Sequence, residues 1–299
     1  MMNKEDFLER IQKLTHPLAP VSVNTEPRLH KLNNIRCIAF DFYGTMFISA
    51  VGDIGIDEEK EESNADYFAE ALESSGFTLR QNDAAKRGIQ IFDETISTHI
   101  ERAKNDGIDY PEPVITAVWL DVLTKLLNEK LIEGNISEEV AMQFGIEFEF
   151  RVNDVWPVPD LKPVLNKLLE RNLKLGIISN SQFYTPLTFE AVLGKSPAEF
   201  GFDPDLLIWS YESGRKKPSP DFYRLFNRAT EKKNISPEEI LFVGNDIRKD
   251  IQPAKEVGMK TALYVGDRRS VRHEDHELKL PEFMADIVID DLKQLPECL

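Results

Sequence analysis

The sequence predicts an α/β fold in which a parallel sheet is interrupted by an inserted helical domain. After residue 154, apolar runs of strand length alternate with amphipathic segments of helical length, a pattern typical of βαβ units. A further apolar run at 35–40 precedes a block, residues 49–153, in which helical periodicity dominates. We therefore expect residues 35–40 to join the same sheet as the later runs, with the helical block inserted between them.

The apolar run at 35–40 ends at Asp41 and is followed by a turn through Gly44. A continuous apolar run bounded by a turn signal indicates a strand that is buried on both faces of a parallel sheet. Open α/β sheets bind their ligands beyond the carboxyl ends of the strands, so Asp41 is a candidate functional residue. Its alternative role is to end the strand by hydrogen-bonding its own turn.

The sequence of the inserted block predicts a loop and four helices. A glycine-rich, acidic stretch at 51–57 indicates a mobile loop. Ser137, followed by two glutamates, has the pattern of a helix N-cap. Helical periodicity covers residues 63–75, 83–104, 113–130 and 137–152.

The other predicted elements flank this block. Amphipathic helices are predicted at 4–14, 160–172, 219–231 and 251–257, and strands at 173–179, 206–210, 240–243, 261–265 and 285–289. The first of these helices belongs to an N-terminal extension, residues 1–33. We expect it to pack on its own domain in preference to a second subunit. The sequence leaves the oligomeric state open.

The charge and cysteine content of the chain limit the binding partners and the cellular compartments that we expect. The chain has 299 residues and a formal net charge of −16, which argues against nucleic acid or an anionic membrane as a partner. Two cysteines, Cys37 and Cys298, do not suggest a disulfide framework, so a cytoplasmic location is expected. No apolar stretch has the length of a signal peptide or a membrane span.

Four short motifs occur in order along the chain. They are Asp41-Phe42-Tyr43-Gly44-Thr45, Leu175-Gly176-Ile177-Ile178-Ser179-Asn180, Lys217-Pro218 and Val243-Gly244-Asn245-Asp246-Ile247-Arg248-Lys249-Asp250. Together they resemble motifs I to IV of the haloacid dehalogenase (HAD) superfamily. The resemblance implies a Rossmann-like core, residues 34–48 and 154–299. It also implies a type 1 helical cap, residues 49–153, that closes over the site and carries most substrate contacts.

The resemblance assigns catalytic roles to the first and third motifs. Asp41 matches the nucleophile, whose carboxylate forms a covalent ester or acyl phosphate. Lys217 would keep Asp41 ionised and neutralise charge on the transferred group. Tyr43 stands where most HAD phosphatases carry an aspartate that acts as general acid and base, and tyrosine is typical of 2-haloacid dehalogenases. Tyr43 is therefore either a catalytic residue or a packing residue that offers only its backbone carbonyl.

The resemblance also implies a Mg²⁺ site. Its ligands would be the carboxylates of Asp41 and Asp246, the carbonyl of Tyr43 and water. Asn245 and Asp250 would support these ligands, with Asp250 orienting water or the lysine. The alternative role for Asp246 is to cap the helix that follows it.

Substrate contacts are assigned to Thr45, Ser179 and Asn180. Hydroxyl and backbone N–H groups at the end of a strand can bind phosphate or carboxylate oxygens, which implies a small anionic substrate. The alternative for Ser179 and Asn180 is an ordinary turn.

Three functions remain open at this stage. A Mg²⁺-dependent phosphatase acting on a small phosphorylated metabolite is favoured by Asp246, because dehalogenases need no metal. A metal-independent 2-haloacid dehalogenase is favoured by Tyr43, although Ile247 stands where that enzyme class has an active-site asparagine. The third alternative is a catalytically weak HAD-fold protein with a binding or regulatory role. We favour the phosphatase.

Overall fold

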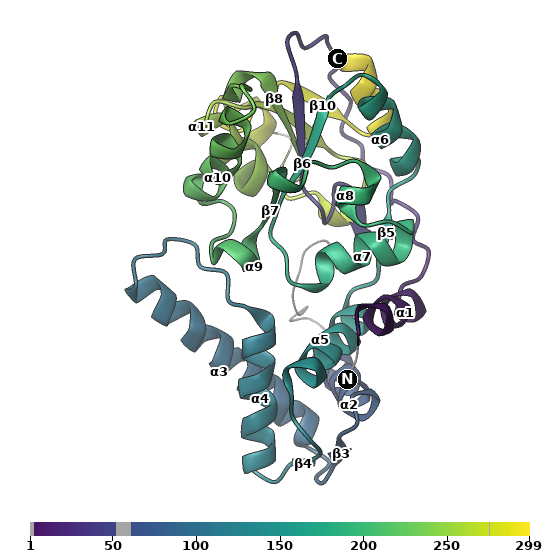
Figure 1. Cartoon of the computed structure of the whole chain (residues 1–299), viewed down its shortest axis with the longest axis vertical. Coiled ribbons are helices and arrows are strands. Elements are labelled where there is room, and N and C mark those ends of the chain that lie inside the picture. Colours follow the sequence, from purple (N-terminus) through teal and green to yellow (C-terminus); the bar gives the residue numbers. More distant parts are fainter. Residues whose placement is uncertain (1–2, 52–60, 275) are drawn as a thin grey trace.

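The computed structural model describes residues 3–51, 61–274 and 276–299. Most of the loop predicted at 51–57 therefore lies outside the described residues. Figure 1 shows a sheet flanked by helices at one end of the molecule and a separate group of helices at the other. Within the described ranges, no helix is both long and apolar enough to cross a membrane.

The sheet has six strands, and every neighbouring pair is parallel. Its order is β10-β9-β8-β1-β6-β7. The central strand β1 pairs with β6 and β8, and Phe40 lies opposite Ile177 and Val243. The strands are β1 (Cys37–Phe40), β6 (Lys174–Ser179), β7 (Leu207–Trp209), β8 (Ile240–Gly244), β9 (Lys260–Tyr264) and β10 (Ile287–Ile289). The predicted α/β fold class is confirmed.

Both faces of the sheet are buried, which explains why its strands are mainly apolar. Ile38 and Phe40 belong to one core cluster, with α6 (Leu161–Glu170) and α7 (Tyr184–Leu193). Cys37 and Ala39 face the opposite way and pack in a second cluster with α10 (Pro220–Glu231). This alternation follows the two-residue period of a strand. The carboxyl ends of β1, β6 and β8 consequently meet at one edge between the two layers.

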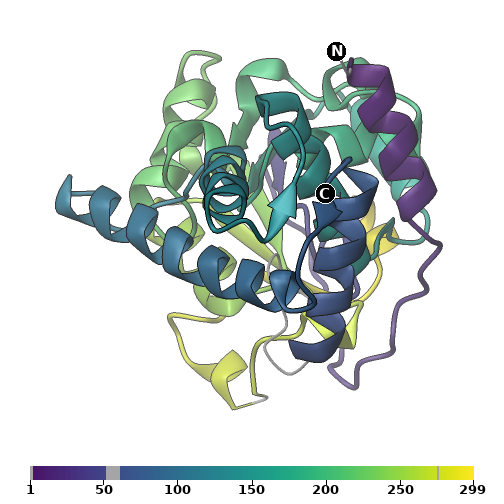
Figure 2. The ribbon, with the colours of Figure 1, turned by 90° about the horizontal axis from the view of Figure 1, so that it is seen from below.

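The cap contains the four predicted helices. They are α2 (Glu61–Ser74), α3 (Ala84–Asn105), α4 (Ile115–Asn128) and α5 (Glu138–Val152), which lie together in Figures 1 and 2. The ring centroid of Phe144 lies 5.0 Å from that of Phe68 and 4.9 Å from that of Trp119, both edge to face. Ser137 caps α5 by accepting a hydrogen bond from the N–H of Val140 (3.2 Å).

Two short strand pairs were not predicted. Within the cap, β3 (Thr78–Leu79) pairs antiparallel with β4 (Ile132–Glu133). At the junction of cap and core, β2 (Phe47–Ser49) pairs with β5 (Val155–Pro157). Each partner is distant in sequence, so no local pattern indicates the pairing. The domain limits at 48/49 and 153/154 stay a prediction.

The helix after β8 begins earlier than the predicted 251–257. A π-helical turn spans Ile247–Ile251 and continues into α11 (Gln252–Glu256). It starts here because Asp246 Oδ1 accepts hydrogen bonds from the N–H groups of Arg248 (2.7 Å) and Lys249 (2.9 Å). The other short helices are α8 (Pro197–Phe200), α9 (Ser210–Ser213) and 3₁₀ turns at Pro204–Leu206, Pro237–Glu239, Arg268–Ser270, Glu277–Lys279 and Leu292–Cys298.

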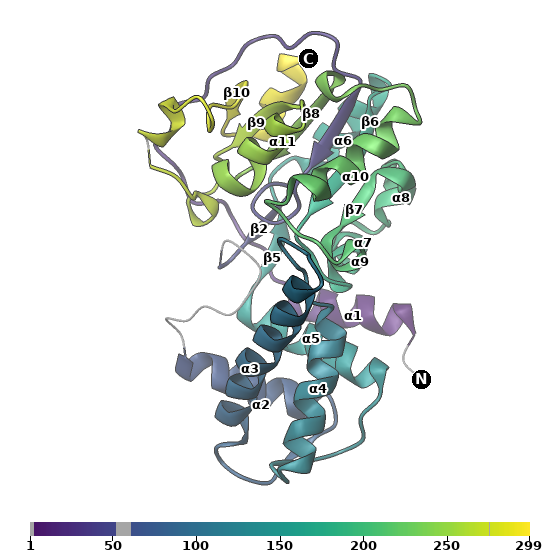
Figure 3. The same ribbon diagram turned by 90° about the vertical axis from the view of Figure 1, so that its left-hand side faces the viewer.

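The N-terminal helix α1 (Lys4–Leu14) packs against both α5 and α7. Phe7 and Ile11 are its buried residues. Arg10 forms an ion pair with Glu147 of α5, and Gln12 Nε2 donates to the carbonyl of Ala191 in α7 (2.7 Å). The helix therefore contacts one helix of the cap and one of the core, as Figure 3 shows.

Candidate active site

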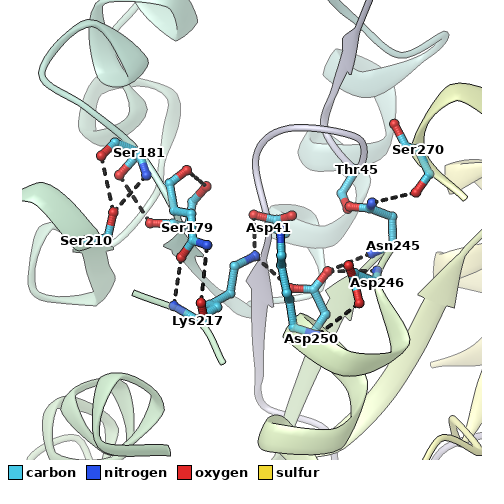
Figure 4. Close-up of polar contacts among 12 residues, drawn as sticks. Asp41, Thr45, Ser179, Ser181, Ser210, Lys217, Asn245, Asp246, Asp250 and Ser270 are labelled. Atoms are coloured by element: carbon cyan, nitrogen blue, oxygen red, sulfur yellow. Dashed lines mark hydrogen bonds and ion pairs between the residues drawn. The ribbon is translucent and has the colours of Figure 1, made fainter. Parts of the chain in front are cut away.

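The ammonium of Lys217 lies between two carboxylates at the edge where β1 and β8 end (Figure 4). Its Nζ is 2.7 Å from Asp41 Oδ1 and 2.6 Å from Asp250 Oδ1. All three side chains are buried. Burial alone would lower the pKa of Lys217, but the negative charges of Asp250 and Asp41 raise it above its usual value. Lys217 is therefore a fixed positive charge beside Asp41.

Asp250 is positioned by the backbone that follows β8. Its Oδ2 accepts hydrogen bonds from the N–H groups of Asn245 (2.9 Å) and Asp246 (3.0 Å). Gly244 allows this close approach, because a Cβ there would lie 2.6 Å from Asp250 Cγ. Burial raises the pKa of Asp250 and the charge of Lys217 opposes the shift. The π-helical turn thus aims Asp250 back at the lysine.

The turn after β1 depends on a glycine. Gly44 has a φ of +79°, and a Cβ there would lie 2.7 Å from Ser270 Oγ and 2.9 Å from Asn245 Cγ. Thr45 Oγ1 donates to Asn245 Oδ1 (3.1 Å), and Asn245 Nδ2 donates to the carbonyl of Ser270 (3.0 Å). Asn245 therefore joins the turns after β1, β8 and β9. Thr45 is fully buried in this contact, and its predicted role in substrate binding stays a prediction.

Asp41 and Asp246 line the same small cavity, whose volume is about 20 Å³. That volume suits one water-sized species. The cavity is lined by three carboxylates, Asp41, Asp246 and Asp250, and by three basic side chains, Lys217, Lys249 and Arg272. Carboxylate oxygens are ligands of the kind that Mg²⁺ prefers, and Asp41 and Asp246 both bring them to this cavity. The residues present therefore fit this ion.

Among the described residues, Asp41 and Asp246 do not belong to a larger group of metal-binding side chains. Across the described ranges, no group of three or more His, Cys, Asp or Glu side chains is placed to hold a metal ion. The remaining residues around the small cavity are Tyr43, Asn180, Lys217, Asn245, Lys249 and Arg272. Lys249 and Arg272 were not predicted as site residues, and the sequence signal for Lys249 was its place within the fourth motif.

Asn180 holds the backbone of Lys217. Its Oδ1 accepts from the N–H of Lys217 (2.7 Å) and its Nδ2 donates to the Lys217 carbonyl (3.4 Å). Ser179 Oγ donates to the carbonyl of Asn180 (3.1 Å) and is fully buried. Both side chains thus make internal contacts at the end of β6. Their predicted contacts with a substrate stay predictions.

The hydroxyl of Tyr43 contacts Thr185 of α7, with 3.0 Å between the two oxygens. Burial, together with the negative charge of Glu149, raises the pKa of Tyr43 well above its usual value of 10.0. The phenol therefore stays neutral and cannot act as a general base near pH 7. Thr185 is a neighbour that the sequence did not indicate.

A second, larger cavity of about 730 Å³ lies between the cap and the core. It is in the size range of small-molecule sites. From the core it is lined by Gln182, Tyr184 and Lys216, the last directly preceding Lys217. Phe92 stacks on Trp119 in its wall, with ring centroids 4.4 Å apart. The cavity therefore adjoins the Lys217 segment.

Comparison with known proteins identifies the family. Residues 35–258 match the family model described as a haloacid dehalogenase-like hydrolase, and this stretch includes all four motifs. The chain belongs to this family. The hydrolase is 33% identical over 209 residues to a glyceraldehyde 3-phosphate phosphatase of Pyrococcus furiosus, across 70% of this chain and 77% of that protein.

Solved structures of both branches share the fold of this hydrolase. A 2-haloacid dehalogenase from Pseudomonas syringae pv. tomato has a TM-score of 0.53 and 22% identity, covering 88% of this chain and 97% of that one. A HAD phosphatase from Thermococcus onnurineus has a TM-score of 0.50 and 18% identity over the same shares. The predicted family membership is confirmed, while the fold alone does not separate dehalogenase from phosphatase.

Proposed function

We propose that this hydrolase is a phosphatase acting on a small phosphorylated metabolite, with Asp41 as nucleophile. The observation that carries the proposal is the shared cavity of Asp41 and Asp246, next to the buried Lys217 ammonium. An anionic ester approaching this group of carboxylates needs positive charge, which Lys217 supplies in part. A halide displacement would not require a second carboxylate facing the nucleophile.

The chain's own groups support two displacement steps. A carboxylate oxygen of Asp41 attacks phosphorus, the bond from phosphorus to the ester oxygen breaks, and an aspartyl phosphate forms. Water then attacks phosphorus and releases phosphate, which regenerates Asp41. Lys217 lies 2.7 Å from Asp41 and faces the charge that develops. Tyr43 is not a carboxylate, so we propose that the leaving group takes its proton from water, from the substrate itself or from a cap residue.

We propose Asp41, Asp246 and the carbonyl of Tyr43 as the residues that would hold Mg²⁺. When bound, the ion would screen the repulsion between the nucleophile and an anionic ester. Asp246 Oδ1 is already held by two backbone N–H groups, so its carboxylate orientation is fixed without the ion. Thr45, Ser179 and Asn180 are proposed to shape the phosphate site.

The named relative supports the phosphatase over the alternatives. The glyceraldehyde 3-phosphate phosphatase aligns over 77% of its own length. Its substrate is a small phosphorylated molecule, and the 730 Å³ cavity has room for a molecule of that kind. We propose a small anionic substrate. A cytoplasmic location stays a prediction.

The 2-haloacid dehalogenase is the second candidate, and Tyr43 is the residue that favours it. Displacing a halide needs no proton donor, and the neutral Tyr43 phenol is compatible with that chemistry. The two candidates differ in their products and in their need for a metal.

A panel of phosphorylated metabolites and 2-haloacids tests both, with and without Mg²⁺. We expect phosphate release that requires Mg²⁺ and stops in excess chelator, and we expect Asp246→Ala to abolish it. Asp205→Ala, an exposed aspartate that pairs with Lys233, is the matched control. Halide release in chelator would replace the proposal by the dehalogenase. No turnover of either class would favour a binding or regulatory protein.

A further inference from the structure

The segment between α3 and α4 lies against the loop that carries Lys217. We call residues 106–114 the cap connector and residues 210–219 the lysine loop. The N–H of Glu112 donates to the carbonyl of Gly214 (3.1 Å), and the N–H of Lys216 donates to the carbonyl of Tyr110 (2.9 Å). Pro111 and Arg215 form an isolated antiparallel bridge between these two bonds. The cap thus pairs with the lysine loop through its backbone.

Glu112 fastens the start of the lysine loop. Its Oε2 accepts from Ser210 Oγ (2.9 Å), and its Oε1 accepts from Gln182 Nε2 (3.2 Å). Ser210 Oγ also accepts from the N–H of Ser181 (2.8 Å). One carboxylate from the cap therefore joins the lysine loop to the segment just after Asn180, whose side chain holds the backbone of Lys217.

Asp109 fastens the end of the same loop. Its two oxygens accept from Ser219 Oγ at 3.1 and 2.8 Å, and Oδ1 also accepts from Arg215 (3.0 Å). Ser219 is fully buried. Lys217 therefore lies between two points at which carboxylates of the cap connector hold its loop.

We propose that the cap connector positions Lys217, with Glu112 and Asp109 as positioning residues. Docking of the cap then completes the contact between the ammonium and Asp41, because the lysine loop takes its position from the cap as well as from the core. A misplacement of about 1 Å at a reacting group can lower the rate about 10²-fold. We therefore expect loss of the connector contacts to lower kcat. The inference rests on the proposed function of Asp41 and Lys217.

The test compares Glu112→Ala with Glu129→Ala. Glu129 is also a cap glutamate, but its partner is Arg87 of the cap. With Mg²⁺ and an aryl phosphate, we expect Glu112→Ala to lower kcat about 10- to 100-fold. The KM is measured as well, because Glu112 also lines the large cavity, and a loss confined to KM would mean that Glu112 acts on substrate binding and would overturn the proposal. The control should retain the wild-type kcat. An unchanged kcat in folded Glu112→Ala would overturn the proposal.

A double variant shows whether Glu112 acts through the lysine. In a Lys217→Met background, Glu112→Ala should have little further effect on kcat, because the group that it positions is gone. Multiplicative losses in the double variant would mean that Glu112 acts independently of Lys217, and that would also overturn the proposal. If Glu112→Ala fails to fold, Glu112→Gln replaces it in every comparison, with a smaller loss expected.

Hydrogen exchange separates this inference from the proposed function. Amides of the lysine loop should exchange faster in Glu112→Ala than in wild type or Glu129→Ala. If the wild-type protein hydrolysed no phosphate ester, the proposed function would fail. The exchange comparison would then support or refute the positioning contact without any activity. Equal exchange in all three proteins refutes it.

Discussion

The two cavities of this hydrolase are built in different ways. The small one, about 20 Å³, is formed by side chains that follow β1, β6 and β8 and are held by backbone hydrogen bonds. The large one, about 730 Å³, is formed by four cap helices, the cap connector and two core segments, and several of its side chains are exposed. Under the proposed function, the first determines the reaction and the second determines which molecule reacts. Changes in the two cavities should therefore affect kcat and KM differently.

The largest effect is expected from Asp41→Asn. The substitution keeps the side-chain shape and removes the nucleophile, so kcat should fall at least about 10³-fold for every substrate. The melting temperature should stay within about 3 °C of wild type. Steady-state kinetics and calorimetry measure both. Activity retained by this variant would contradict the assignment of the small cavity as the reaction site.

Asp250→Asn should have the next largest effect and should change the pH profile. The carboxylate of Asp250 helps to raise the pKa of Lys217, so Lys217 stays charged across the neutral and moderately alkaline range. Without this carboxylate, Asp41 alone of the two opposes the effect of burial, so the pKa of Lys217 falls. We expect kcat to drop about 10²-fold, with the alkaline loss of activity moving to lower pH.

The pH dependence of kcat/KM between pH 6 and 10 measures this shift. Asp221→Asn, an exposed aspartate of α10, controls for the loss of one negative charge. An alkaline limb at the same pH in Asp250→Asn and wild type would show that Asp250 does not control the lysine.

Tyr43→Asp tests whether residue 43, which lines the small cavity, stands in the position of a general acid. A carboxyl here would have a pKa raised by burial, which suits a general acid, and such catalysis is typically worth about 10²–10⁴-fold. We expect activity on alkyl phosphates to rise by up to about tenfold, and activity on an aryl phosphate to change little, because its leaving group needs no proton. The ratio of the two rates is the measurement. An equal change for both substrates would place residue 43 outside the acid position.

The smallest effect is expected in the large cavity. Phe92→Ala removes one ring of the stacked pair in its wall and leaves the small cavity intact. The KM should change by about two- to tenfold, by different factors for substrates of different size, while kcat on an aryl phosphate stays within about twofold. A uniform loss of kcat for all substrates would show that the two cavities are not separate in function.

The small cavity was largely accessible from sequence, because its residues follow buried strands. Continuous apolar runs predict such strands, and the side chain that ends each run lies at the ligand edge of the sheet. Asp41 was located in this way, whereas Asn180, Lys217 and Asn245 were located by their places in the family motifs. The structure brings Asp41, Asn180, Asn245 and Lys217 together around one cavity.

The long-range polar contacts could not be predicted from the sequence, for physical reasons. Glu112, Gln182 and Thr185 form polar contacts between segments that are distant in sequence, and no local period marks them. Helix α7 was missed because it is buried on most sides, and it also carries Pro186, so its sequence shows no polar face. Helical periodicity identifies a cap helix, but not which of its side chains faces the substrate.

The N-terminal extension also pairs with one edge strand of the six-stranded sheet. β10 is an edge strand of only three residues, and Arg28 pairs with its middle residue, Val288. The N–H of Arg28 donates to the Val288 carbonyl (2.9 Å), and the N–H of Val288 donates to the Arg28 carbonyl (3.1 Å). Edge strands with free main-chain groups are templates for pairing with another molecule. Because these groups are already bonded within the chain, this margin of the sheet is protected against edge-to-edge aggregation.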